Sequence, residues 1–290
     1  MPDPKPSLTL VLPAYNEAAR LPSALDELFG YLGRTGAPRS GGRSADDLGA
    51  WSVLIVDDGS DDDTVAVAEA RSEARPGPAG EPPRLTVLRR PHGGKGAAVR
   101  AGVLAATADL VVFADSDMAT PPDQLPLLTD ALATHDVALG SRVQPDGTDR
   151  RGSQPFHRRA LGKVFHALAG AWVTGDVPDS QCGFKGFRRI AGQDLFARQQ
   201  ITSIVFDAEV IHLARKRGYS MAVVPVQWTD QRGSRMRVRP RLAVRVAWDL
   251  IRIPLIHRGV RHAAEADRVR VGPATLDADP AQPARRRPGA

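Results

Sequence analysis

Two acidic residues, Asp115 and Asp117, are the side chains whose types and spacing most directly suggest chemistry. They follow an apolar run at residues 110–114, which is typical of a buried parallel strand. Residues two apart on an extended chain share one face, so both carboxylates can bind the same cation. Water and substrate phosphates normally complete a hard divalent cation held this way. The pair therefore indicates a metal-diphosphate site, although Asp and Ser are also common in plain turns.

A sheet must position this pair, and the sequence predicts one. Apolar runs typical of strands lie at residues 8–12, 51–56, 85–89, 110–114 and 137–139. We expect one helix that ends at about residue 32 and a second that starts near residue 63. A third is expected over about residues 97–106, and a fourth is expected to start at 121–122. Because strands and helices alternate at this spacing, we expect an α/β fold with a mainly parallel sheet flanked by helices. Pro13 is expected to end the first strand.

Several of these strands end in polar or glycine-rich residues. The carboxyl ends of parallel strands lie along one edge of a sheet, where ligands bind. We therefore expect the following residues to converge there: Asp57, Asp58, Lys95, Asp115, Asp117 and Arg142. The turn at residues 13–17 lacks the glycines of a dinucleotide fingerprint, and residues 94–96 lack the leading glycine and trailing Ser/Thr of a P-loop. Hydride transfer and P-loop phosphoryl transfer are both disfavoured.

Composition narrows the class of protein. The chain has 290 residues, a formal net charge of +6 and a single cysteine, Cys182. The basic charge favours an anionic partner, and one cysteine excludes an intrachain disulfide and favours a reducing compartment. We expect no signal peptide, because residues 1–4 (MPDP) are not a charged segment followed by an apolar one. We expect no membrane-spanning helix, because no apolar run approaches ~18 residues. Few aromatic residues and no nucleic-acid motif argue against a nucleic-acid-binding protein, which remains an alternative.

Four blocks together resemble family 2 glycosyltransferases of the GT-A fold, a Rossmann-like architecture. These blocks are residues 13–17 (PAYNE), 57–60 (DDGS), 94–96 (GKG) and 115–117 (DSD). Further blocks at 140–142, 179–185, 206–209, 226–228 and 233–235 resemble the dolichyl-phosphate β-glucosyltransferase branch. The resemblance covers roughly residues 7–260 and implies one catalytic domain.

The resemblance assigns roles to matching positions. Pro13, Tyr15, Glu17 and Asp57 would line a uridine pocket, with Asp58 nearby, Lys95 at its edge and Gln181 in the same nucleotide-sugar site. Asp115 and Asp117 would hold Mg²⁺ or Mn²⁺ against the donor diphosphate, and Arg142 would bind the acceptor phosphate. His92 stands where the family has Asn and receives no role. Ala119 stands where mannosyl relatives have Gln, which favours UDP-glucose over GDP-mannose.

The function implied is inverting transfer of glucose from UDP-glucose to a polyprenyl (dolichyl-type) phosphate, which gives a β-linked product. An acceptor phosphate is already ionised near neutral pH and needs no strong general base.

Alternatives are a mannosyltransferase that uses GDP-mannose and a transferase with a soluble acceptor. The latter would need a base, for which Asp207 is the candidate catalytic residue. Asp207 and Glu209 interrupt an apolar segment, and two interpretations stay open: one acid faces the site, or one caps a helix. Cys182 is expected to be a buried, unreactive thiol.

Two segments, at about residues 155–174 and 240–257, have amphipathic helical patterns with basic residues. Each is compatible with a core-facing helix and with a helix lying on anionic lipid. The first resembles the interface helix of polyprenyl-phosphate sugar synthases, which favours a peripheral protein at the cytoplasmic face of a membrane. The same resemblance assigns Arg158 or Arg159 to the lipid phosphate. Pro254 is expected to kink or end the second helix, and residues 263–290 are expected to form a disordered basic tail.

Overall fold

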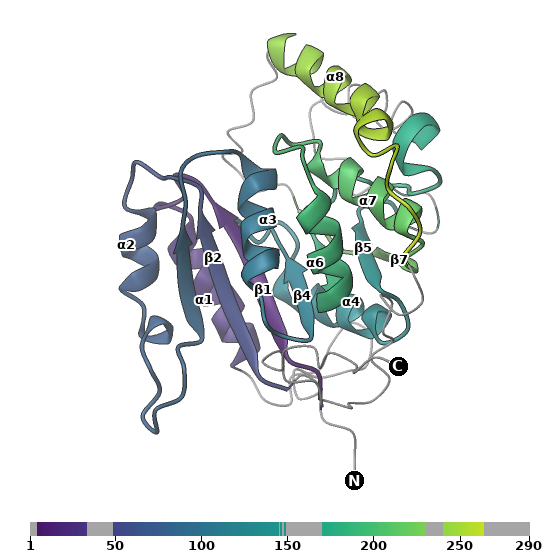
Figure 1. Ribbon diagram of the computed structural model, residues 1–290. Coiled ribbons are helices and arrows are strands. Elements are labelled where there is room, and N and C mark those ends of the chain that lie inside the picture. Colours follow the sequence, from purple (N-terminus) through teal and green to yellow (C-terminus); the bar gives the residue numbers. More distant parts are fainter. Residues whose placement is uncertain are drawn as a thin grey trace, which may run out of the picture.

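The computed structural model describes residues 5–33, 49–144, 146, 148, 170–229 and 240–263. At its centre is a seven-stranded sheet in the order β3-β2-β1-β4-β6-β5-β7 (Figure 1). The strands are β1 (Leu8–Ala14), β2 (Trp51–Asp57), β3 (Leu85–Arg89), β4 (Leu110–Phe113), β5 (Val137–Ser141), β6 (Lys185–Arg188) and β7 (Met221–Pro225). The five predicted strands are confirmed, and only β6 runs antiparallel to its neighbours in this sheet.

One predicted boundary is wrong, because β1 continues through Pro13 to Ala14. The carbonyl of Val11 accepts the N–H of Ala114, so residue 11 and, two positions on, Pro13 face the β4 side. The β1–β4 pairing ends at Val11 and Phe113. An N–H group at position 13 would therefore point beyond the end of the β1–β4 pairing. Proline is tolerated there, and β1 keeps its pairing with β2 as far as Ala14.

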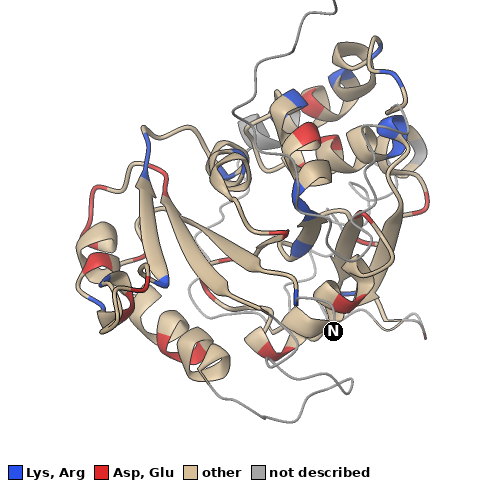
Figure 2. Cartoon of the chain, turned by 60° about the horizontal axis from the view of Figure 1, so that its bottom comes forward, with Lys and Arg blue, Asp and Glu red and all other residues tan. Residues whose placement is uncertain are grey.

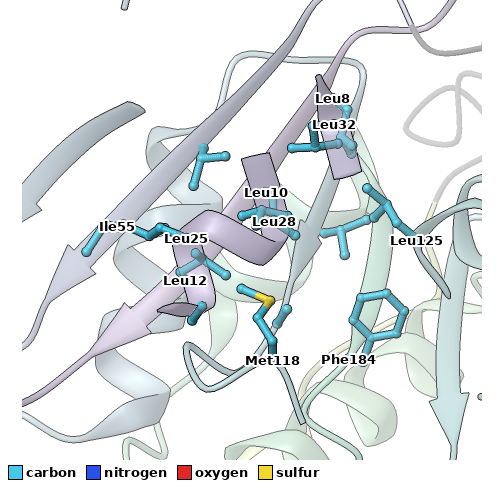
Figure 3. Close-up of a cluster of buried hydrophobic side chains, with 14 of the residues drawn as sticks. Leu8, Leu10, Leu12, Leu25, Leu28, Leu32, Ile55, Met118, Leu125 and Phe184 are labelled. Atoms are coloured by element: carbon cyan, nitrogen blue, oxygen red, sulfur yellow. The ribbon is translucent and has the colours of Figure 1, made fainter. Parts of the chain in front are cut away.

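Helices cover both faces of the sheet (Figure 1). They are α1 (Leu21–Leu32), α2 (Thr64–Glu69), α3 (Lys95–Ala105), α4 (Leu125–Leu132), α6 (Arg189–Arg198), α7 (Phe206–Arg217) and α8 (Pro240–Ile256), with the short turns η2 (Ser72–Ala74), η3 (Pro122–Gln124) and η5 (Gly170–Thr174). Apolar residues of α1 and α4 pack with Leu8, Leu10 and Leu12 on one face (Figure 3). On the other face of the sheet, Val11 packs with apolar residues of α3, α6 and α7. Alternate strand residues thus bury into opposite layers, as in doubly wound folds.

The order of the strands fixes where a ligand can bind. After β1 the chain forms β2 and β3 on one side, and it then crosses back to place β4 on the other side of β1. Strand order therefore reverses between β1 and β4, and the crevice outside the carboxyl ends of such strands is the usual ligand site of open α/β sheets.

The C-terminal helix α8 packs on α7 and η5 through Leu250 and Ile253, at one end of the molecule (Figure 1). Pro254 does not end the helix, since α8 continues to Ile256. Of the predicted segment 155–174, only residues 170–174 fall within the described residues, and they form a π-helical turn. Among the helices described, none combines the length and apolar character needed to cross a bilayer.

Candidate active site

The two acids predicted to bind a metal lie directly after β4, beside the point where strand order reverses. Asp115 Oδ1 lies 2.5 Å from Nζ of Lys95, the first residue of α3. Asp117 accepts a hydrogen bond from the backbone N–H of Ala119 over 3.1 Å. Burial and the negative charge of Asp115 raise the pKa of Asp117 above its ordinary value. The fold thus holds two carboxylates close enough to repel one another, which a shared cation would relieve.

Met118 holds the turn that carries Asp117. Its backbone φ is 50°, in the left-handed region that non-glycine residues rarely adopt. Its side chain is buried in the apolar layer beneath α1, near Leu12 and Leu25 (Figure 3). Burial of this side chain offsets a backbone strain of about 1–2 kcal/mol. The core therefore fixes the direction in which the acidic turn leaves β4.

The loops after β1 and β2 are hydrogen-bonded to each other. Asn16, with φ 56°, donates its backbone N–H to Ser60 Oγ (2.9 Å), and its side chain accepts the N–H of Asp61 (2.8 Å). The N–H of Glu17 donates to Thr64 Oγ1 (2.7 Å). Glu17 itself forms an ion pair with Arg20. These contacts bring the predicted nucleotide-binding residues of the two loops to one edge.

Asp58 joins the loop after β2 to the glycine-rich turn that precedes α3. Its buried carboxylate accepts the N–H groups of Gly93 (3.1 Å) and Gly94 (2.8 Å) and pairs with the Arg90 guanidinium. Gly94 has φ 95°, and a Cβ there would lie 2.8 Å from the carbonyl oxygen of Thr202. The contacts of Asp58 thus position Lys95 at the start of α3.

Lys95 belongs to a line of alternating charges that continues into the protein interior. Burial opposes its charge, but attraction from Asp115 and Asp207 outweighs burial and raises the pKa of Lys95. Asp207, buried in the first turn of α7, pairs with Lys185 (2.6 Å). Lys185 is fully buried at the start of β6, where Nζ also donates to the Cys182 carbonyl. Asp207 therefore faces the site, whereas Glu209 points away and accepts the N–H groups of residues 200 and 201.

The segment from Asp179 to Lys185 completes the site. Asp179 binds the Arg142 guanidinium through both carboxylate oxygens, at 2.7 and 2.8 Å. Burial lowers the pKa of Arg142, but the Asp179 hydrogen bonds prevail and raise it. A Cβ on Gly183 would lie 2.3 Å from Asp115 Oδ2, so only glycine allows this approach. Cys182 is buried, and burial raises its thiol pKa to about 12, in accord with an unreactive role.

The remaining predicted residues are placed as follows. Pro13 and Asp57 lie at the ends of β1 and β2, Tyr15 is exposed just after β1, and Gln181 is half-buried in the segment beside Asp115. Arg158 and Arg159 fall outside the described residues. Sequence reasoning did not single out Lys185 or Asp179 individually, although both lie in the block 179–185. The signal that could have found Lys185 is a lysine with glycine and phenylalanine on both sides of it, in residues 183–187 (GFKGF).

Comparisons with known proteins identify the family of this chain. Residues 9–196 match the family model described as glycosyl transferase family 2. The parallel strand ends, the paired acids and this match define a glycosyltransferase with a GT-A-like fold, and the chain belongs to glycosyl transferase family 2.

Relatives and solved structures refine the placement. A dolichyl-phosphate beta-glucosyltransferase of Trichomonas vaginalis is 32% identical over 86% of this chain and 71% of its own length. That of Drosophila melanogaster is 34% identical over 80% of this chain and 70% of its own. The chain therefore falls in the dolichyl-phosphate β-glucosyltransferase branch. The Mycobacterium tuberculosis glucosyl-3-phosphoglycerate synthase, solved with Mn²⁺, UDP-glucose and phosphoglyceric acid, shares the fold, with a TM-score of 0.57, 20% identity and coverage of 88% and 80%.

Proposed function

We propose that this protein transfers glucose from UDP-glucose to a polyprenyl phosphate of the dolichyl type, with inversion to a β-linked product. The observation that carries the proposal is the convergence of Asp115, Asp117 and Lys95 with Arg142 at one edge of the sheet. Carboxylates and a lysine suit a diphosphate with its cation, and an arginine suits a second phosphate. The names of the relatives support the acceptor and the sugar.

The residues present fit a divalent cation. Asp115 and Asp117 offer carboxylate oxygens, and the pKa of Asp117 is raised by its neighbour's charge. Within the described parts of the chain, no group of three or more His, Cys, Asp or Glu side chains could hold a metal alone. Two carboxylates plus substrate phosphates is the usual arrangement for Mg²⁺. When bound, Mg²⁺ or Mn²⁺ would supply positive charge to the diphosphate leaving group.

The residues of the chain then have distinct tasks. Lys95, kept charged by Asp115 and Asp207, stabilises negative charge on the departing UDP. Arg142, fixed by Asp179, orients the acceptor phosphate towards the sugar. The acceptor phosphate is itself the nucleophile and is already ionised, so no proton needs to be removed. Asp207 is paired with Lys185, which suits a role in positioning the lysines better than one as a base.

Replacing Arg142 by Lys should mainly impair use of the acceptor. A lysine cannot form the two parallel hydrogen bonds to Asp179 and still present donors in a fixed plane. We expect the KM for polyprenyl phosphate to rise by roughly tenfold or more, because a charge-assisted contact contributes about 1.5–3 kcal/mol, while the KM for donor stays within about twofold of wild type. Steady-state kinetics with each substrate varied in turn measure both. An unchanged acceptor KM would remove Arg142 from the acceptor site.

A lipid acceptor requires the protein to reach a membrane surface, and we propose that α8 and η5 provide the contact. One side of α8 is buried against α7, but Trp248, Ile251 and Leu255 on its other side are 52–62% exposed. Trp172 of η5 is equally exposed and donates its indole N–H to the Ile251 carbonyl. Aromatic and aliphatic side chains with nearby arginines are typical of helices at lipid interfaces; basic residues of α8 are visible in Figure 2.

Introducing charge into this face should weaken membrane binding. In a Trp248→Glu variant, we expect co-sedimentation with vesicles containing anionic lipid to fall at least about fivefold, because apolar burial is lost and a like charge is added. Folding should be retained, since Trp248 is 62% exposed. Val223→Glu, at a residue 42% exposed on β7, is the matched control and should bind vesicles normally. Equal binding by both variants and wild type would exclude α8 as the contact.

The proposed reaction is tested by transfer of labelled sugar to polyprenyl phosphate in detergent. UDP-glucose and GDP-mannose are compared, each with and without Mg²⁺. A metal-dependent lipid product from UDP-glucose alone is the expected result. Product from GDP-mannose would overturn the donor, and release of UDP without a lipid product would overturn the acceptor and return attention to Asp207 as a base.

A further inference from the structure

A buried polar network beside the Lys95 turn has no part in the reaction described above. Glu209, in the first turn of α7, is fully buried. Its two carboxylate oxygens accept the backbone N–H groups of Gln200 and Ile201, each over 2.8 Å. The third partner is Nε2 of the buried His257, 2.7 Å from Glu209 Oε1. A buried carboxylate is tolerated only where such donors surround it, so Glu209 fixes the backbone of residues 200 and 201.

The segment at residues 199–203 binds the turn that carries Lys95. The carbonyl oxygen of Thr202 accepts the N–H of Gly96 (3.1 Å), and Gln199 Nε2 donates to the Gly96 carbonyl oxygen (3.0 Å). The residue next to Lys95 is therefore held at both of its backbone polar groups. A Cβ on Gly96 would lie 3.0 Å from the Thr202 carbonyl oxygen, so the two segments approach as closely as a glycine allows.

The C-terminal helix α8 is attached to the same segment by two buried groups. Asp249 of α8 accepts a hydrogen bond from Ser203 Oγ over 2.6 Å, and Asp249 is itself buried. His257, which directly follows α8, binds Glu209. Hydrogen bonds thus join α8 to the segment that holds the Lys95 turn.

Resting on the proposed function, in which Lys95 binds the donor diphosphate, we infer that Glu209 is a positioning residue for Lys95 and that His257 holds Glu209 for this task. Lys95 Nζ lies 2.5 Å from Asp115 Oδ1, so a shift of the Lys95 backbone moves the ammonium relative to the paired acids. Glu209 acts through residues 199–203, since its oxygens bind backbone N–H groups and an imidazole rather than the lysine. It therefore affects any ligand whose diphosphate binds Lys95, whatever group that diphosphate carries.

Calorimetric titration with Mn²⁺ present tests this inference with two probes, UDP and inorganic pyrophosphate. In Glu209→Gln the amide oxygen still accepts one backbone N–H, but the NH₂ group faces the other donor and displaces residue 200 or 201. We expect both probes to bind roughly tenfold more weakly, because misplacing a binding group by about 1 Å can have an effect of this size or larger. In a Lys95→Met background the same substitution should weaken pyrophosphate binding no further, since no lysine is left to position.

Further variants separate positioning from a general loss of stability. His257→Leu should weaken the binding of both probes, and His257→Gln, which keeps an N–H donor for Glu209, should restore it. Asp194→Asn is the matched control, because this carboxylate of α6 pairs with Arg217 at the opposite end of α7 from Glu209. We expect the control to lower the Tm but to leave both affinities within about twofold of wild type.

The outcomes keep this inference and the proposed function apart. If Glu209→Gln binds both probes as wild type does, or weakens pyrophosphate binding in the Lys95→Met background as well, the inference is refuted and the donor assignment stands. Loss of UDP binding alone, or an equal loss in Asp194→Asn, would also refute it. If the wild-type chain binds pyrophosphate but not UDP, the proposed donor fails, while weaker pyrophosphate binding by Glu209→Gln would still support the inference. If the wild-type chain binds neither probe, both fail.

Discussion

Replacing Asp117 by Asn is expected to reduce sugar transfer by about 10²–10³-fold, the loss typical of removing one electrostatic stabiliser of a leaving group. The amide keeps the size of the side chain and its hydrogen bond from Ala119 but removes the charge that binds a cation. Transfer should also lose its dependence on Mg²⁺ or Mn²⁺. Labelled-sugar transfer across a range of metal concentrations measures both effects.

The same substitution should make the protein more stable at neutral pH without divalent metal. Burial and Asp115 raise the pKa of Asp117 in the folded state, so the folded protein holds this proton more tightly than the unfolded chain does. Ionised Asp117 therefore destabilises the fold at pH values above its unfolded pKa, and this effect disappears below that pKa. Thermal unfolding at pH 7 should show a higher Tm for the variant, with the difference lost near pH 3. Asp176→Asn, at an exposed turn, is the control.

Replacing Lys185 by Met should lower the free energy of unfolding by about 3–5 kcal/mol, because the buried carboxylate of Asp207 loses its partner. Asp207→Asn should also destabilise the protein, since the Lys185 ammonium then stays buried near the Phe113 ring. The double variant Lys185→Met, Asp207→Asn removes both charges and should recover most of the loss. Urea denaturation of the four proteins gives the coupling free energy directly.

This cycle also distinguishes the two roles considered for Asp207. If Asp207 is a general base, the Asp207→Asn variant should have normal stability, a low kcat and an altered pH–rate profile. If Asp207 is a positioning residue, the variant should be destabilised by an amount that depends on Lys185, and its pH–rate profile should be like that of wild type. We expect the second result, because Asp207 lies between two lysines rather than at an open face.

The sequence alone determined the first five strands of the sheet and the convergence of the residues that follow them, whereas β6 and β7 were not predicted. Apolar runs before Asp57 and Asp115 predict parallel strands, and the glycines before Lys95 predict a turn, because strand period and glycine-rich turns are local properties of the chain. Parallel strands expose their carboxyl ends on one edge, so the meeting of these residues follows from topology. The paired acids and the absence of a P-loop pattern were sufficient to direct attention to a metal-diphosphate site.

Only the tertiary structure decided which charges pair. Placing β6 antiparallel between β4 and β5 puts Lys185 at the site edge, where its ammonium pairs with Asp207 from α7. The pairing of Arg142 with Asp179 and the contact of Tyr15 with His92 likewise join residues 37 or more positions apart. No local pattern encodes these contacts, because they depend on which distant segments the packed core brings together.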